Sequence, residues 1–90
     1  MGPIADLLRT KLERGLSPDH LEISDQSDRH AGHAGARAGG ESHFDVRIVS
    51  AAFAGLRPVQ RQRLVHALLE AELAGPVHAL SLQLRAPGET

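Results

Sequence analysis

Histidine is the residue type in this chain that could carry chemistry, because the chain has six histidines and no cysteine. Neutral imidazole is the commonest metal ligand in proteins. His30 and His33 lie three residues apart in a glycine-rich segment, while His43 and His78 each come at the beginning of a segment of alternating apolar residues. A His-x-x-His pair in a loop is by itself a weak signal, so these four residues form a candidate site only if the fold brings them together.

His78 is the sharpest single candidate. Alternation places it on the same face as the leucines of the last segment, so it is either a hydrogen-bonded histidine at the edge of the core or a ligand held by a rigid strand. The pattern alone favours the first interpretation. His43 falls on the face opposite Phe44. For His20, in a polar turn, and His66, on the flank of a helix, the sequence favours solvated or partly packed side chains over ligands.

The absence of cysteine restricts the metal chemistry that these histidines could support. It excludes a disulfide scaffold, a thiolate zinc site, a catalytic thiol and a self-contained iron–sulfur cluster. A zinc site made only of histidines would need three or four imidazoles. Two imidazoles can ligate one iron of a [2Fe–2S] cluster, but the thiolates for the second iron would then come from another molecule. The sequence therefore predicts either a shared cluster or no cluster.

Charge and length limit the function classes further. The net charge is −1, whereas a nucleic-acid-binding domain is typically strongly basic. Ninety residues suffice for one domain and exclude a two-domain enzyme with an interdomain cleft. No nucleophile–base arrangement or phosphate-binding loop is present, so we predict no enzyme and no catalytic residues. Arg57, Arg61 and Arg63 do not form a continuous stripe on a helical wheel, which favours a solvated helix.

We also expect no targeting leader and no membrane span. The first residues already form an amphipathic segment, and no apolar run approaches the roughly 20 residues that span a bilayer. A soluble cytoplasmic protein is the expectation that follows.

The elements that must position the histidines follow from hydrophobic periodicity. In chain order the sequence predicts a helix at 3–14 that Gly15 ends, strands at 20–24 and 42–50, a helical turn at 51–56, a helix from Pro58 to the stop at Gly75-Pro76, and a strand at 77–84. A flexible loop is predicted at 25–41 and a disordered tail at 86–90. Helices on one face of a small mixed three-stranded sheet make an α+β two-layer sandwich, with a single domain over 1–90.

Five segments of the chain, taken together, resemble the BolA family, and the resemblance covers about residues 4–87. They are residues 21–27, 41–44, 49–55, 61–65 and 77–80. The loop sequence His-Ala-Gly-His-Ala-Gly is similar to that of bacterial members with a histidine-type loop. The chain departs from the family pattern at Gln26, where the family has Glu, and at Gln62, where it has His. Neither difference removes a candidate ligand.

The resemblance implies a class II K-homology-like fold and a non-enzymatic role. BolA-like proteins pair with monothiol glutaredoxins of the Cys-Gly-Phe-Ser (CGFS) type and share a glutathione-ligated [2Fe–2S] cluster, which implies cluster trafficking or iron sensing. Carried onto this sequence, one cluster ligand is His78 and the second is His30 or His33, with His43 a distant third. The alternative is a DNA-binding transcriptional regulator, with weak DNA binding expected from the balanced charge. We expect the free protein to be a monomer or a weak homodimer.

Overall fold

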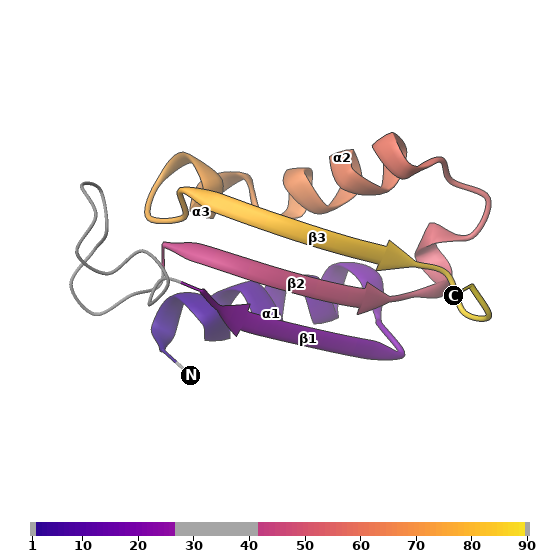
Figure 1. Ribbon diagram of the computed structural model, residues 1–90, viewed down its shortest axis with the longest axis horizontal. Helices are drawn as coiled ribbons and strands as arrows, with labels where there is room; N and C mark the ends of the chain where they lie inside the picture. The colour runs from indigo at the N-terminus through magenta and orange to yellow at the C-terminus, as the bar shows by residue number, and fades with distance from the viewer. Residues whose placement is uncertain (1, 27–41, 90) are drawn as a thin grey trace.

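The computed structural model describes residues 2–26 and 42–89. It contains, in chain order, α1 (Pro3–Leu16), β1 (His20–Asp25), β2 (His43–Val49), a 3₁₀ turn η2 (Ala51–Phe53), α2 (Pro58–Leu68), α3 (Glu70–Ala74) and β3 (Ala79–Arg85). Figure 1 shows the three strands side by side as one layer, with α1 behind them. The predicted α+β sandwich with a mixed three-stranded sheet is confirmed.

The strand order β1–β2–β3 fixes which ends of the sheet meet. β1 runs antiparallel to β2, so that His20 lies opposite Val49 and Asp25 opposite Phe44. β2 runs parallel to β3, and His43 lies opposite Ala79. Because two parallel strands start at the same edge, the first residues of β2 and the residues that precede β3 lie at one end of the sheet.

The core lies between the sheet and the helices. Phe44, Val46 and Ile48 alternate along β2, and all three are buried, as their shared face predicts. From the helix side they meet Leu8 and Leu12 of α1, which are also buried in the same cluster. Full burial of such a side chain contributes about 1.5–3 kcal/mol each. This apolar layer holds β2 as the central strand, on which both of its neighbours depend.

Two helix boundaries differ from those predicted. Gly15 does not end the first helix, which continues to Leu16 and ends where Ser17 adopts a left-handed conformation with φ 43°. Gly15 serves packing instead, because a Cβ at this position would lie 2.7 Å from the side chain of Leu68. The predicted second helix divides at Leu69, whose backbone (φ −108°, ψ 18°) departs from helical values, into α2 and the shorter α3.

The last predicted strand is shifted along the chain. It begins at Ala79 and not at residue 77, because the Val77 N–H donates to the Glu72 carbonyl and not to the sheet. The predicted tail at 86–90 also differs over the residues that the structure describes. Ala86 is buried, and its N–H donates to the carboxylate of Glu89. Most of the loop predicted at 25–41, with His30 and His33, lies outside the described residues, whereas Asp25 belongs to β1.

An ion pair ties α3 to α1. Lys11 Nζ donates to both carboxylate oxygens of Glu72, at 2.9 and 2.7 Å. The Glu72 side chain is 5% exposed, while that of Lys11 is 34% exposed. The carboxylate therefore depends on Lys11 for its charge partner, whereas the ammonium can also reach water.

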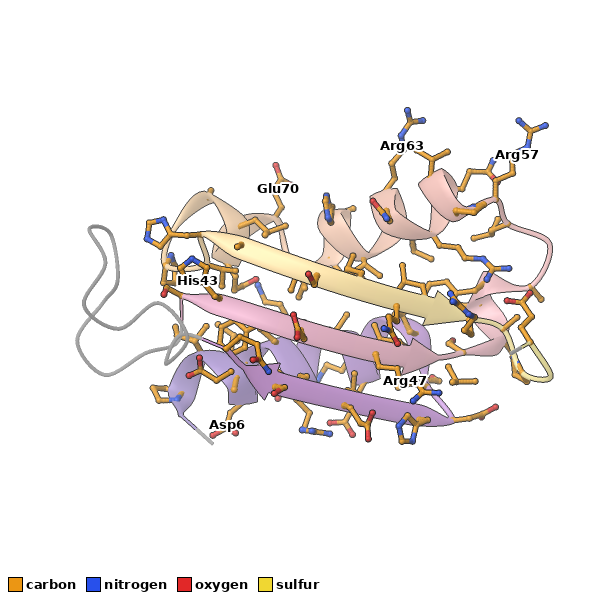
Figure 2. The ribbon with its side chains drawn as sticks, in the orientation of Figure 1. Asp6, His43, Arg47, Arg57, Arg63 and Glu70 are labelled. Atoms are coloured by element: carbon orange, nitrogen blue, oxygen red, sulfur yellow. The ribbon has the colours of Figure 1, made fainter. Side chains whose placement is uncertain are left out.

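A second pair ties the C-terminal turn to α2. The Arg61 guanidinium donates to the two carboxylate oxygens of Glu89 at 2.6 and 2.9 Å, and its Nε donates to the Leu56 carbonyl at 3.0 Å. The predicted solvated helix therefore applies to Arg57 and Arg63, which point outward from α2 (Figure 2), and not to Arg61. No helix among residues 2–26 and 42–89 is long and apolar enough to cross a membrane.

The Lys11–Glu72 pair predicts an asymmetry in stability. Lys11→Met leaves a buried carboxylate without a cation and should lower the free energy of unfolding by about 2–3 kcal/mol. Glu72→Gln keeps an acceptor for Lys11 and should cost about 1 kcal/mol. Urea denaturation measures both, with the exposed Arg14→Met on the same helix as the control. Equal costs, or a larger cost for Glu72→Gln, would contradict the assignment of Glu72 as the buried partner.

The Arg61–Glu89 pair predicts a dependence of stability on pH. The hydrogen bonds from Arg61, and next the one from the Ala86 N–H, lower the pKa of Glu89 from its ordinary 4.5 to about 2. A lowered folded-state pKa means that the stabilisation is complete above pH 4.5 and is lost as the pH falls toward 2. The difference in Tm between the native chain and Glu89→Gln should therefore be constant above pH 5 and shrink between pH 4.5 and 2. A difference that stays constant down to pH 2 would refute the lowered pKa.

Candidate metal-ligand site

Two histidines lie together at the end of the sheet where β2 and β3 begin. The ring centroids of His43 and His78 are 6.4 Å apart, and the ring planes are inclined by 30°. His78 is exposed, and His43 is half-buried. Figure 2 shows His43 at the start of β2, beside the segment that enters β3. We call this pair the sheet-end histidines.

Ser42 fixes the backbone and one ring of the sheet-end histidines. It is fully buried, and its carbonyl accepts hydrogen bonds from the N–H groups of His78 (2.7 Å) and Ala79 (3.2 Å). Its hydroxyl oxygen lies 2.8 Å from His43 Nδ1, within a hydrogen bond. Ser42 therefore sets the backbone position of His78 and the ring orientation of His43.

The turn between α3 and β3 holds His78 from the other side. The Glu72 carbonyl accepts hydrogen bonds from the N–H groups of Gly75 (3.2 Å) and Val77 (3.0 Å). The Glu72 side chain is bound to Lys11 at the same time. Val77 is also buried, so the residue immediately before His78 is anchored by packing as well as by a hydrogen bond. His78 therefore stands on a fixed backbone while its imidazole is exposed.

The structure corrects the favoured interpretation of His78. The sequence places this residue at the edge of the core, on the face of the last strand's leucines, but its side chain is exposed and it precedes β3. The reason is that the chain still forms the α3–β3 turn at Val77, so the alternation of the strand does not yet apply. His43 does lie on the face opposite Phe44, as predicted. The proximity of the two histidines depends on parallel pairing, which the sequence pattern does not reveal.

The other four histidines form two groups, two that the structure describes and two that it does not. His20 lies opposite Val49, at the far end of the sheet, and its Nε2 is 3.4 Å from a carboxylate oxygen of Glu22. His66 is exposed on α2. The prediction of solvated side chains is confirmed for both. His30 and His33, the predicted loop ligands, lie outside the described residues.

The donor set at the sheet end is incomplete for a closed metal site. Within residues 2–26 and 42–89, no group of three or more His, Cys, Asp or Glu side chains is arranged to hold a metal ion. The sheet-end histidines offer two imidazoles, and a tetrahedral zinc or iron centre has four ligands. This end of the sheet can therefore contribute donors to a site that other groups complete.

Comparison with known proteins places the chain in a family. The family model described as BolA-like protein matches residues 12–89. The chain is 51% identical over 89 residues to BolA-like protein 1 of Homo sapiens, a match that covers 99% of this chain and 62% of the human protein. It is 44% identical over 79 residues to the DNA-binding transcriptional regulator BolA of Vibrio cholerae, which covers 88% of this chain and 71% of that protein.

A solved structure gives the same result. The BolA domain of SufE1 from Arabidopsis thaliana superposes with a TM-score of 0.89 at 44% identity, over 100% of this chain and 99% of that domain. The chain spans about three fifths of the length of the mammalian BolA-like protein 1 sequences that it matches. The matched residues include α2, the sheet and both sheet-end histidines. The chain therefore belongs to the BolA-like protein family.

Proposed function

We propose that this chain is a non-enzymatic partner protein that shares a glutathione-ligated [2Fe–2S] cluster with a monothiol glutaredoxin of the CGFS type. In this role the cluster is cargo, and the pair serves iron–sulfur cluster trafficking or iron sensing. The observation that carries the proposal is His78, an exposed imidazole on a backbone that Ser42 and Glu72 hold fixed. Family membership supports the same role.

The chemistry of the available donors fits a shared cluster. Imidazole is an established ligand for one iron of a [2Fe–2S] centre, and the other iron requires thiolates. This chain has no cysteine, so the thiolates come from the partner and from glutathione. An exposed His78 can reach a ligand site that lies on a second protein. His30 or His33 supplies the second imidazole in this proposal, and His43 is the third choice.

The ligand type sets how the site responds to its surroundings. A neutral imidazole in place of a thiolate removes negative charge from a cluster, which raises its reduction potential. A histidine must be deprotonated to ligate, so ligation by this chain competes with protons. The residues of this chain thus bind and orient the cluster and tune its reduction potential, and no bond-breaking step is assigned to them.

A second candidate function is DNA binding by a transcriptional regulator. The Vibrio cholerae relative carries that name, and Arg57, just before α2, and Arg63, on α2, both extend outward (Figure 2). A net charge of −1 favours only weak attraction to phosphates. Tight, salt-sensitive binding of the free chain to duplex DNA would favour this function over the first.

Cluster sharing is tested by titrating the free chain into a [2Fe–2S]-loaded monothiol glutaredoxin with glutathione present. We expect a new visible circular dichroism spectrum that saturates at one to one. His78→Ala should abolish this spectrum, because it removes the ligand on the fixed backbone. His20→Ala and His66→Ala are matched controls, since both imidazoles are exposed, His20 lies at the far end of the sheet and His66 on α2, and these variants should keep it.

The loop variants identify the second ligand in the same titration. If one of His30→Ala and His33→Ala loses the spectrum and the other keeps it, the histidine whose replacement abolishes the spectrum is the second ligand. A full spectrum with His78→Ala would refute the ligand assignment, and no spectral change with the native chain would refute cluster sharing.

A further inference from the structure

We propose that the outer edge of β3, the edge that faces away from β2, binds an extended acidic peptide as a fourth strand of the sheet. The strand order is β1–β2–β3, so no strand among residues 2–26 and 42–89 pairs with this edge. Figure 1 shows β3 at the border of the sheet, with α2 beside it. The inference does not depend on the proposed function, because it uses neither a cluster nor a histidine.

Hydrogen bonds at both ends of β3 show which of its backbone groups face outward. The Ala79 N–H donates to the Ser42 carbonyl. The Arg85 carbonyl accepts a hydrogen bond from the Ser50 N–H, so β3 bonds to β2 through its odd-numbered residues. The register is unbroken between these ends, and the backbone groups of successive residues point to opposite sides of a strand. The backbone groups that face outward therefore belong to the three leucines of β3: Leu80, Leu82 and Leu84.

The Leu84 carbonyl supports this assignment independently. It accepts hydrogen bonds from the guanidinium groups of Arg61, at 3.3 Å, and Arg85, at 3.0 Å, and neither residue belongs to β2. Leu84 therefore faces outward, and side chains already occupy its carbonyl. The outward N–H and carbonyl groups of Leu80 and Leu82 form the part of the edge to which a new strand can bond.

The sequence of β3 lacks the features that usually protect an edge strand. Natural edges are shielded by proline, by bulges, by inward-pointing charges or by a covering element. β3 contains no proline, pairs with β2 without a bulge and points leucines at the core. Beside it lies a groove of about 640 Å³ that Pro58 and Gln62 of α2 and Leu82 of β3 help to line. This groove gives an added strand room for its side chains.

A peptide matches this edge because its backbone supplies donors and acceptors in alternation, whereas a nucleic-acid backbone offers no N–H donor. The side chains of an added strand alternate between the two faces of the sheet. Those opposite the leucines point to the side of the groove, where Leu82 and Pro58 favour apolar residues. Those opposite Gln83 and Arg85 lie on the open face, where polar residues stay in water. The expected ligand therefore alternates between apolar and polar residues.

Charge favours an acidic peptide, and it favours β3 over β1. The charged groups that line the groove are two cations and one anion, Arg61, Arg85 and Glu89, so their sum is one positive charge. Arg61 is bound to Glu89, which leaves the exposed Arg85 to meet a carboxylate on the incoming strand. The other border strand, β1, carries Glu22 and Asp25, which repel such a carboxylate.

Binding is measured by the fluorescence anisotropy of a labelled peptide, Val-Glu-Val-Glu-Val with threonine at each end and both termini blocked. The titration uses the whole chain without glutaredoxin at low ionic strength, where charge interactions are least screened. We expect saturable binding of one peptide per chain, and binding of the matched valine–lysine peptide that is weaker by about fivefold or more. Absence of saturable binding would overturn the proposal.

Charge variants of the chain test the role of Arg85. Arg85→Gln should weaken binding of the acidic peptide by about two- to fivefold, as expected for an exposed ion pair. Arg14→Gln removes an exposed cation from α1 and is the matched control, with unchanged affinity. Equal weakening in both variants would show attraction to net charge alone and would contradict a site at β3. His78→Ala should bind the peptide as the native chain does, so this inference and cluster sharing fail separately.

Amide hydrogen exchange locates the bound strand. In the complex, the N–H groups of Leu80 and Leu82 should be protected about tenfold or more above the free chain, because they gain strand partners. The N–H groups of Ser81 and Gln83 face β2 already and should change little. Protection of the β1 amides instead would show that the peptide chooses the other edge.

Two N-methylated peptides test strand addition itself. Methylation of the valine nitrogens and methylation of the glutamate nitrogens block opposite edges of the peptide. One of them should weaken binding by about tenfold or more, through lost hydrogen bonds, and the other should keep the affinity. Equal effects of the two would rule out strand addition. A short single-stranded DNA that protects the same amides and binds more tightly than the peptide would refute a peptide occupant.

Discussion

The parallel pairing of β2 with β3 is the constraint on which the rest of the structure depends. A parallel neighbour must return to the end of the sheet from which the first strand began, and α2 and α3 supply that return. The return brings His78 to His43, although 34 residues lie between them in the chain. The Ser42 carbonyl completes the arrangement, because it accepts N–H groups from the residues that open β3.

Buried polar groups at this end of the sheet are each used more than once. Ser42 binds a ring with its hydroxyl and two backbone N–H groups with its carbonyl. Glu72 binds Lys11 with its carboxylate, while its carbonyl closes the turn before His78. Buried polar groups are costly unless they are paired, so this arrangement tolerates few alternatives. The exposed imidazole of His78 and the half-buried one of His43 thus stand on a support whose polar groups are satisfied.

The alternation of Phe44, Val46 and Ile48 was enough to predict β2 and its buried face, because period-2 burial is a property of the strand itself. The order of elements likewise predicted the sandwich. Helix boundaries were missed because their causes are tertiary. Gly15 lies inside the first helix, close against the side chain of Leu68, and the second helix divides at Leu69, just before Glu72 of α3 pairs with Lys11 of α1. A sequence pattern records neither contact.

The sequence identified the residues of the candidate site but not their arrangement in space. His78 stood out as a histidine before an apolar strand, yet its exposure follows from the Val77 hydrogen bond to Glu72, which lies in a turn and obeys no periodicity. The pairing of His78 with His43 requires knowledge that β3 is parallel to β2. The comparisons confirm the resemblance to the BolA family. That resemblance, and not the local patterns, is the source of the ligand role expected for His78.

The hydrogen bond from the Gln26 N–H to the His43 carbonyl, at 2.7 Å, closes the β1–β2 ladder directly beside the sheet-end histidines. Gln26 and Ser42, the described residues that flank residues 27–41, therefore both lie next to those rings. The buried core residues all lie outside the interval between these two points, among the residues that the structure describes. The pairing of β1 with β2 thus fixes the two points between which residues 27–41 run, and both points adjoin the histidine at the start of β2.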